Sequence, residues 1–464
     1  EANLDTFDGS CTPNIHVDRH GRFTFAGMVY RAGLPTTPNA YQKNLIADGP
    51  RIELGLWHHF FGRFRCDGIT PDYLTYFGME GRDLRTAMDQ AQQEIHNNRV
   101  YTLHGLIESW STERDHPYYP ITAGALERRY AIDSMRSMYL ACFDTTGMLA
   151  YGSRLNCIPG QGGGASYRPL RIGHDDHVYI CGDNVLRELP YVSPGVFQDT
   201  ATVKRSFLMK LTPDCDSVVY CTYLPETTQV VDVGADAEGY ATLLAGNKGH
   251  FRMKNAFQPV CKEQGDFVIA RFSPAGDSLV FSTYLGGDFL EGHAGYLGYT
   301  PQLLVTPSGE SHVVSITRSE DFPLHRPLQT TYRYTGFGMH RESDLVLAGF
   351  AADGSILYST YWGGLHEEYP LSLNLTPCGT ILISGSTNSP DFPVCNPRAF
   401  STRDTSGWRQ FVMLFDPVNV RVRSMYMQRD SGHSWLRDAD FDPTGHMYML
   451  GAAQFGFDQY NGYL

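Results

Sequence analysis

The stretch Phe281-Ser282-Thr283-Tyr284-Leu285-Gly286-Gly287 decides the fold, because the chain repeats it. Residues 358–364 read Tyr-Ser-Thr-Tyr-Trp-Gly-Gly, and residues 220–224 and 73–78 are weaker copies. An alternating apolar run and a Gly-bearing turn precede each copy, which is typical of a β-hairpin. Since a hairpin cannot bury its apolar face alone, its recurrence predicts stacked units that share a core.

A second hairpin pattern alternates with the first. Its clearest copy is residues 376–387, followed by Asp391-Phe392-Pro393 and a proline-containing segment that ends at Phe400. Residues 17–27 and the segment after them have the same form near the N-terminus. Successive turn glycines are about 70 residues apart, so two hairpins per repeat give the four strands of a propeller blade with long loops.

These two patterns resemble the SBBP family, a bacterial β-propeller repeat. Its pattern is a Tyr-Ser-Thr-Tyr-Leu-Gly-Gly hairpin followed by Asp-Phe-Pro-Thr-Thr-Pro-Gly-Ala-Phe-Gln. The resemblance is strong between about Asp266 and Phe400 and weaker over most of the remaining chain. It implies a propeller in secreted or surface proteins, frequently of Bacteroidota, and carries no agreed activity.

We therefore predict an all-β fold in which residues 1–464 form a single β-propeller of four-stranded blades. Seven second-type hairpins occur, near residues 13–42, 96–127, 174–198, 231–258, 303–328, 371–400 and 440–464. Six first-type hairpins occur, near residues 54–80, 137–155, 206–224, 266–287, 343–364 and 409–427. The count favours seven blades, the last completed by residues 1–12, by the tail after Gly451 or by a partner's strand. Six blades is the alternative.

Residues 81–98 break the repeat pattern. Leu84, Met88, Ala91 and Ile95 follow a helical spacing, and Asp83 is available as a cap, so the segment predicts a helical insertion that contacts a partner. The alternative interpretation is a strand at residues 86–89 followed by a long turn.

Composition limits the classes of partner. The net charge of −13 argues against nucleic acid, which requires a basic surface, and no apolar run approaches the ~20 residues of a membrane helix. The chain begins at Glu1 rather than Met, which fits removal of a signal peptide or trimming of the chain. Ten cysteines favour an oxidising compartment, with Cys157, Cys261, Cys378 and Cys395 near turns as disulfide candidates.

Several short sequences that resemble catalytic or metal-binding motifs fall on predicted turns. Residues 276–279 spell Gly-Asp-Ser-Leu, the nucleophile block of one esterase family, at a hairpin turn. Residues 174–177, His-Asp-Asp-His, occupy another turn and lack a third metal ligand. Asp438, Asp440 and Asp442 resemble the start of a calcium loop, but Pro443 and Met449 replace its required Gly and Glu.

The loops after the Gly-Gly turns carry the strongest candidate binding site. Repeat equivalence places their acidic residues on one face of the propeller, where a carboxylate ring would bind Ca²⁺ or a basic partner surface. The alternative is a solvated acidic rim. The candidate residues are Glu80, Asp83, Asp288, Glu291, Glu367 and Glu368.

The repeat family and the missing catalytic motifs favour a non-enzymatic scaffold outside the cell or at the cell surface. We expect it to bind a protein or glycan, with a subunit of a bacterial outer-membrane or surface assembly as a special case. The alternative is a carbohydrate-active lyase or hydrolase with catalytic residues at an axial pocket, none of which the repeats identify. No cofactor is required by either hypothesis, and the enzyme question stays open.

Overall fold

The structure is a computed structural model. It describes residues 14–29, 33–44, 58–78, 91–107, 119–127, 136–155, 169–182, 189–200, 206–225, 229–246, 250–262, 265–289, 291–292, 301–335, 342–394, 408–427, 434–442, 444–454 and 460–463.

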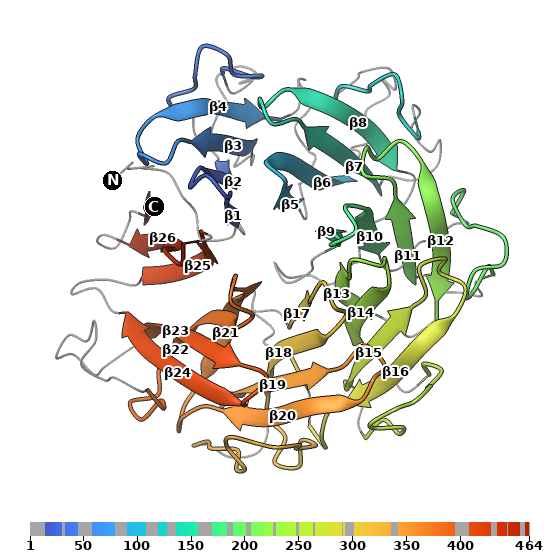
Figure 1. Ribbon diagram of the computed structural model, residues 1–464, viewed down its shortest axis with the longest axis vertical. Helices are drawn as coiled ribbons and strands as arrows, with labels where there is room; N and C mark the ends of the chain where they lie inside the picture. Colours follow the sequence, from blue (N-terminus) through green and yellow to red (C-terminus); the bar gives the residue numbers. More distant parts are fainter. Residues whose placement is uncertain are drawn as a thin grey trace.

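Seven antiparallel sheets surround a common axis, like the blades of a propeller (Figure 1). Blades 1 and 2 contain β1 (Asn14–Val17), β2 (Phe23–Val29), β3 (His58–Phe64), β4 (Pro71–Phe77), β5 (Ala91–His96), β6 (Arg99–Ile107), β7 (Arg136–Phe143) and β8 (Leu149–Leu155). Blades 3 and 4 contain β9 (Leu170–Ile172), β10 (Val178–Gly182), β11 (Ser206–Leu211), β12 (Val218–Leu224), β13 (Gln229–Ala235), β14 (Ala241–Gly246), β15 (Phe267–Phe272) and β16 (Leu279–Leu285).

The remaining blades follow the same order. Blades 5 and 6 contain β17 (Gln302–Val305), β18 (Ser311–Thr317), β19 (Asp344–Phe350), β20 (Ile356–Trp362), β21 (Glu368–Leu375), β22 (Ile381–Thr387), β23 (Arg409–Asp416) and β24 (Arg421–Met427). The last sheet contains β25 (Ser434–Phe441), β26 (Met447–Gln454) and β27 (Tyr460–Tyr463).

The predicted all-β propeller with four-stranded blades is confirmed. Six blades have four strands, which is the count of the alternative prediction, and the seventh sheet has three described strands. Its third strand, β27, comes from the tail after Gly451 and pairs with β26. No described helix is long and apolar enough to cross a membrane.

The predicted helix over residues 81–98 is wrong for its C-terminal part. Ala91–His96 forms β5, the innermost strand of blade 2, and Asn97 and Asn98 turn the chain with positive φ values of 49° and 61°. Ladder pairing of Ala91–His96 with β6 satisfies the backbone in place of helical hydrogen bonds. Residues 81–90 lie outside the described part of the chain.

The Thr-Tyr pair of the repeated motif fixes the proline-containing segment of its own blade. In β16 the Thr283 Oγ1 accepts a hydrogen bond from the Gln258 amide at 2.9 Å, and the Tyr284 hydroxyl accepts one from the Phe251 amide at 3.2 Å. In β20, Thr360 holds Gln329 in the same way, at 3.1 Å. The motif therefore anchors the proline-containing connection between the second and third strands to the outermost strand of the blade.

Neighbouring blades pack aromatic rings on turn glycines. Gly276, with a φ of +69°, lies so close to the Tyr220 ring of the preceding blade that a Cβ would approach it to 2.4 Å. In the same way, a Cβ at Gly147 would approach the Tyr73 ring to 2.6 Å, and a Cβ at Gly354 would approach Phe281 to 2.5 Å. Only glycine accommodates both the left-handed backbone and this close approach.

Polar side chains of the innermost strands join adjacent blades around the axis. Gln92 Oε1 accepts the Leu170 amide at 3.0 Å, and Asp232 Oδ2 accepts the Leu303 amide at 3.0 Å. The last and first blades are joined in the same way, because Asp438 Oδ2 accepts the Ile15 amide at 3.1 Å. Asp440 adds a second bond to β1, to the Val17 amide at 2.9 Å.

The aspartates that resembled a calcium loop therefore have separate structural tasks. Asp438 and Asp440 close the ring of blades, while Asp442 accepts the Thr444 and His446 amides of its own turn, each at 2.9 Å. These backbone bonds agree with the rejection of an EF-hand.

Candidate functional site

Strand direction places the repeated loops on two faces of the disc. The tight turns after the first and third strands of each blade lie on one face, which we call the turn face. The Gly-Gly loops and the longer connections between second and third strands lie on the other, the loop face. The four described rim residues, Asp288, Glu291, Glu367 and Glu368, follow Gly-Gly pairs and lie on the loop face.

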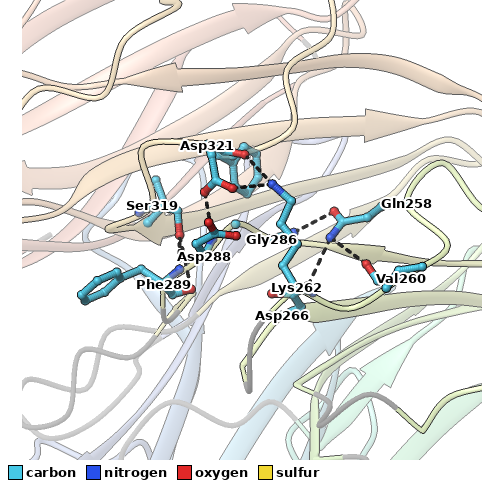
Figure 2. A network of polar contacts seen from close by, with 12 residues as sticks. Gln258, Val260, Lys262, Asp266, Gly286, Asp288, Phe289, Ser319 and Asp321 are labelled. Carbon is cyan, nitrogen blue, oxygen red and sulfur yellow. Dashed lines mark hydrogen bonds and ion pairs between the residues drawn. The ribbon is translucent and has the colours of Figure 1, made fainter.

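Between blades 4 and 5, Asp266 anchors the long connection of blade 4 (Figure 2). Asp266 is fully buried at the start of β15, where its Oδ2 accepts the Gln258 side-chain amide at 3.1 Å and the Lys262 backbone amide at 2.9 Å. The carbonyl oxygen of the same Gln258 side chain accepts the Gly286 amide at 3.2 Å. One carboxylate thus links the connection to the Gly-Gly loop.

Glu291 holds that loop from beneath. Its Oε1 accepts the Gly287 amide at 2.9 Å and the Ser319 hydroxyl of blade 5 at 2.7 Å. Burial raises the pKa of the Glu291 carboxyl to about 7, although the bonds to Ser319 and Gly287 lower it. The side chain therefore connects the loop of one blade with the next.

The outer layer of the network is ionic and partly exposed. The Lys262 ammonium contacts the Asp321 carboxylate across the blade interface, as Figure 2 shows. Asp321 Oδ1 also accepts the Asp288 amide at 2.8 Å, and Ser319 Oγ accepts the Phe289 amide at 2.9 Å. Residues from both blades thereby fix the path of the loop after Gly287.

The same network recurs between blades 5 and 6. Asp344 Oδ2 accepts the Gln329 side-chain amide at 3.1 Å and the Arg333 backbone amide at 3.0 Å. Glu368 accepts the Thr387 hydroxyl at 2.7 Å and the Gly364 amide at 3.3 Å. An ion pair completes it, in which Arg333 Nη2 lies 2.6 Å from Asp391 Oδ2.

Two buried carboxyl groups meet at Gly363. A Cβ at this glycine would lie 2.6 Å from Glu368 Oε2 and 2.7 Å from Asp344 Oδ1, so the loop passes directly between them. Burial raises the pKa of each group to about 8, and the proximity of Glu368 adds to the effect on Asp344. Burial therefore favours the protonated form of both groups.

The predicted rim residues take different positions. Asp288 is exposed, and Glu367 is half-buried with its Oε2 accepting the Tyr369 hydroxyl at 2.8 Å. The alternative of a solvated rim does not hold for Glu291 and Glu368, which are buried and whose carboxyl groups accept hydrogen bonds from loop amides. Glu80 and Asp83 lie outside the described residues. Binding of calcium or a basic partner stays a prediction.

Residues that the sequence analysis missed complete the network. Asp266 and Asp344 begin the third strand of adjacent repeats, and Asp321 and Asp391 begin their Asp-Phe-Pro segments. Their shared repeat position was a signal of a common role. The pattern did not reveal that side chains of two successive repeats meet in space.

The other motifs form turns or structural contacts. Ser278 Oγ bonds its neighbour Asp277 at 3.0 Å on an exposed turn. Asp175 pairs with Lys210 at 2.8 Å, and His174 Nε2 lies 2.9 Å from the Val305 carbonyl oxygen. Among the residues that the structure describes, no group of three or more His, Cys, Asp or Glu side chains is arranged to hold a metal.

The disulfide candidates have mixed outcomes. Cys378 is an exposed free thiol whose pKa is lowered by hydrogen bonds to the Thr376 and Thr380 side chains. Cys157 and Cys395 lie outside the described residues. Cys378 is thus not bonded to another cysteine in this structure, and a disulfide at the candidate positions stays a prediction.

The turn face uses carboxylates in another way. Asp236 and Arg271 are buried and form an ion pair, and Arg271 also donates to the Gly309 carbonyl of the next blade at 3.2 Å. The guanidinium lies over the Tyr240 ring, 4.9 Å from its centroid. Asp175 and Lys210 form the equivalent pair one blade earlier.

No family model matches this chain. A highly reducing polyketide synthase, bet1 of Neocamarosporium betae, is 25% identical over 238 residues, which are 47% of this chain and 8% of that synthase. The match thus spans a small part of the synthase and shows no family.

Solved structures are only weakly similar to this chain. The Pyrococcus horikoshii acylaminoacyl peptidase is 7% identical with a TM-score of 0.43, over 97% of this chain and 50% of that one. Polysaccharide lyase Uly1 is 9% identical with a TM-score of 0.44, over 97% and 88%. The β-propeller domain of the Trilobed protease from Pyrococcus furiosus is 8% identical with a TM-score of 0.33, over 81% and 94%. With TM-scores below 0.5 and identities below 10%, these matches suggest no function for the chain.

Proposed function

We propose that this chain is a non-enzymatic interaction scaffold, which presents its loop face to a protein or glycan partner. The observation that best supports this function is the network that ties each Gly-Gly loop to the following blade. Two ion pairs, Lys262–Asp321 and Arg333–Asp391, and two buried glutamates fix the loops before any partner arrives. A surface fixed in advance loses little conformational entropy on binding.

The proposal includes a location outside the cell or at the cell envelope, where the chain would serve as a subunit of a larger bacterial surface assembly. The resemblance to SBBP repeats and the ten cysteines support this location.

A carbohydrate-active enzyme is the second candidate. It is favoured by Asp344 and Glu368, because a carboxylic acid that stays protonated near neutral pH suits general acid catalysis. Both side chains are fully buried beside Gly363, however, and a glycan would not reach them in this arrangement. This burial is the reason that we place the scaffold first.

The experiment uses the full chain as bait against native envelope fractions, followed by mass spectrometry of the captured proteins. Wild type and an Arg22→Ala control, which breaks an ion pair on the turn face, are expected to capture the same stoichiometric partner. A Lys262→Ala, Arg333→Ala double variant loosens both loop-face tethers and is expected to reduce capture at least tenfold.

Two outcomes would contradict the scaffold function. The first is equal capture by the loop-face variant and the control, which would place the binding surface elsewhere. The second is turnover on a panel of glycans that disappears in the Glu368→Gln variant, which would establish the enzyme instead.

A further inference from the structure

One turn between the third and fourth strands of a blade has a cysteine where four other blades have glycine. The equivalent residues of blades 1, 2, 4 and 5 are Gly68, Gly147, Gly276 and Gly354, all with positive φ values. In blade 3 this position is Cys215, with a φ of 64°. The left-handed backbone conformation is unfavourable for any L-residue with a side chain, so Cys215 is placed here at a cost in backbone energy.

The Cys215 turn packs on the neighbouring blade. It packs against three residues of blade 2 that lie side by side on adjacent strands: Tyr101 in β6, Cys142 in β7 and Tyr151 in β8. The Tyr101 hydroxyl donates to the Pro213 carbonyl at the start of the turn, at 3.5 Å. Tyr101, Cys142, Tyr151 and Cys215 belong to one buried cluster.

An ion pair fixes the position of the turn over this row. Arg99 Nη1 of blade 2 donates to Asp214 Oδ1, the residue directly before Cys215, at 3.1 Å. In blades 2, 4 and 5 the corresponding glycine leaves no space between the turn and an aromatic ring, as Gly276 does over Tyr220. At this interface a side chain replaces the glycine hydrogen, and Cys215 packs in the same buried cluster as Cys142.

Both cysteines are free thiols with no exposed surface. Burial and, second, the electrostatic effect of Cys142 raise the pKa of Cys215 well above its usual value, which agrees with the proximity of the two sulfurs. Cys221 lies in the same cluster but three residues beyond Val218 along β12, roughly 10 Å further along the strand. Cys142 is therefore the better partner for Cys215.

We propose that Cys142 and Cys215 are a disulfide pair that covalently links blades 2 and 3 when the chain folds in an oxidising environment. The oxidant is a small disulfide such as oxidised glutathione. One cysteine thiolate attacks it, releasing one reduced glutathione and forming a mixed disulfide. The second thiolate then displaces the other glutathione, so that two cysteines lose two electrons and two protons in total.

The bond forms before the interface closes. Burial suppresses the thiolate that attacks a disulfide, and the folded protein with reduced cysteines is expected to resist oxidation. A disulfide between blades adjacent in sequence would limit the unfolded chain and so stabilise the fold. This inference is independent of the partner that the loop face binds.

The test is refolding of the full chain with reduced and oxidised glutathione, then alkylation under denaturing conditions and peptide mapping by mass spectrometry. Wild type is expected to yield a peptide pair linked through Cys142 and Cys215, about 2 Da lighter than the two thiol peptides together. A Cys221→Ala variant, which removes a thiol of the same cluster, is expected to retain the link. Cys215→Gly restores the residue of the other repeats, so it is expected to fold and to lack the link.

Thermal unfolding gives a second readout. Oxidised refolding is expected to raise the unfolding midpoint of wild type by several degrees over the reduced protein, and to leave Cys215→Gly unchanged. Complete alkylation of both cysteines after oxidised refolding would overturn the proposal. A link from Cys215 to Cys221 would overturn it equally.

Discussion

On the turn face Asp236 is buried against Arg271, whereas on the loop face Asp344 and Glu368 are buried beside each other. Each arrangement joins adjacent blades, but their electrostatic costs differ. The turn-face carboxylate depends on a desolvated cation, because an unpaired charge in the interior is strongly unfavourable. The loop-face groups avoid that cost by accepting hydrogen bonds from loop amides and hydroxyls and by holding protons. The comparison shows that position in the repeat decides whether a buried acid is an ion-pair partner or a neutral hydrogen-bonding group.

The largest effect is expected from breaking the turn-face pair. Arg271→Met leaves Asp236 buried without its cation and removes the bond to Gly309, so it should lower the free energy of unfolding by about 3–5 kcal/mol. Urea unfolding measures this change. Arg252→Met, at an exposed arginine, is the control and should change it by less than about 0.5 kcal/mol. A loss below about 1 kcal/mol in Arg271→Met would mean that the two faces do not differ in this way.

A smaller loss is expected from filling the gap between the loop-face carboxyl groups. Gly363→Ala places a methyl group within 2.7 Å of both Asp344 and Glu368, and should cost about 1–3 kcal/mol. Gly246→Ala is the matched control, because its nearest neighbour would be the Gln229 carbonyl oxygen at 4.0 Å. Equal stability of the two variants in urea would show that the loop moves freely away from the carboxyl groups.

The protonated state of the loop face predicts a pH dependence. The pKa of Glu368 is about 8 in the folded protein and near its ordinary value of 4.5 when unfolded, so the folded state binds more protons between these values. The contribution of Glu368 to stability is therefore full below about pH 4.5 and is lost as the pH rises through about 8.

Glu368→Gln removes this titration. Between about pH 5 and pH 8 its unfolding free energy should fall less steeply than that of wild type, by up to about 1 kcal/mol per pH unit. Urea unfolding at several pH values measures the slope. Glu238→Gln, at an exposed turn position, should leave the slope as in wild type. Parallel curves for Glu368→Gln and wild type would mean that Glu368 is ionised in the folded protein.

The smallest effect is expected from divalent cations. Glu291 and Glu368 lie beneath their loops and bond loop amides, so EDTA should shift the thermal midpoint by less than about 1 °C. Differential scanning calorimetry with EDTA or with added calcium measures this shift. A rise of several degrees with calcium would support the calcium site that the acidic loops predict.

The repeats predicted the blades well, because the features that define each hairpin are local in sequence. These are its alternating apolar residues, its turn glycine and its Thr-Tyr pair. The burial of carboxyl groups on the loop face could not be predicted from local sequence in this way. Glu291 and Glu368 each follow the second glycine of a Gly-Gly pair by four residues, so the sequence indicated a common role. Whether that role was exposed or buried depended on Ser319 and Thr387 of the following blade, which sequence distance does not reveal.

The segment before blade 2 shows a different limit. Ala91 and Ile95 fit a helical spacing, yet the inner position of blade 2 requires a strand there, and pairing with β6 decided the outcome. In this short segment, strand pairing with β6 determined the structure although the spacing of apolar residues fits a helix. Such ambiguity is expected because a short apolar segment can fit both a helical and a strand pattern.

The seam at Asp438 and Ile15 has a consequence for synthesis. Each described blade takes its strands from one continuous stretch, so the blades can form one after another as the chain leaves the ribosome. Until β25 arrives, the growing protein is a crescent whose first blade has an unmatched side. Packing of the last sheet on blade 1, together with the Asp438 and Asp440 bonds to β1, then closes the ring.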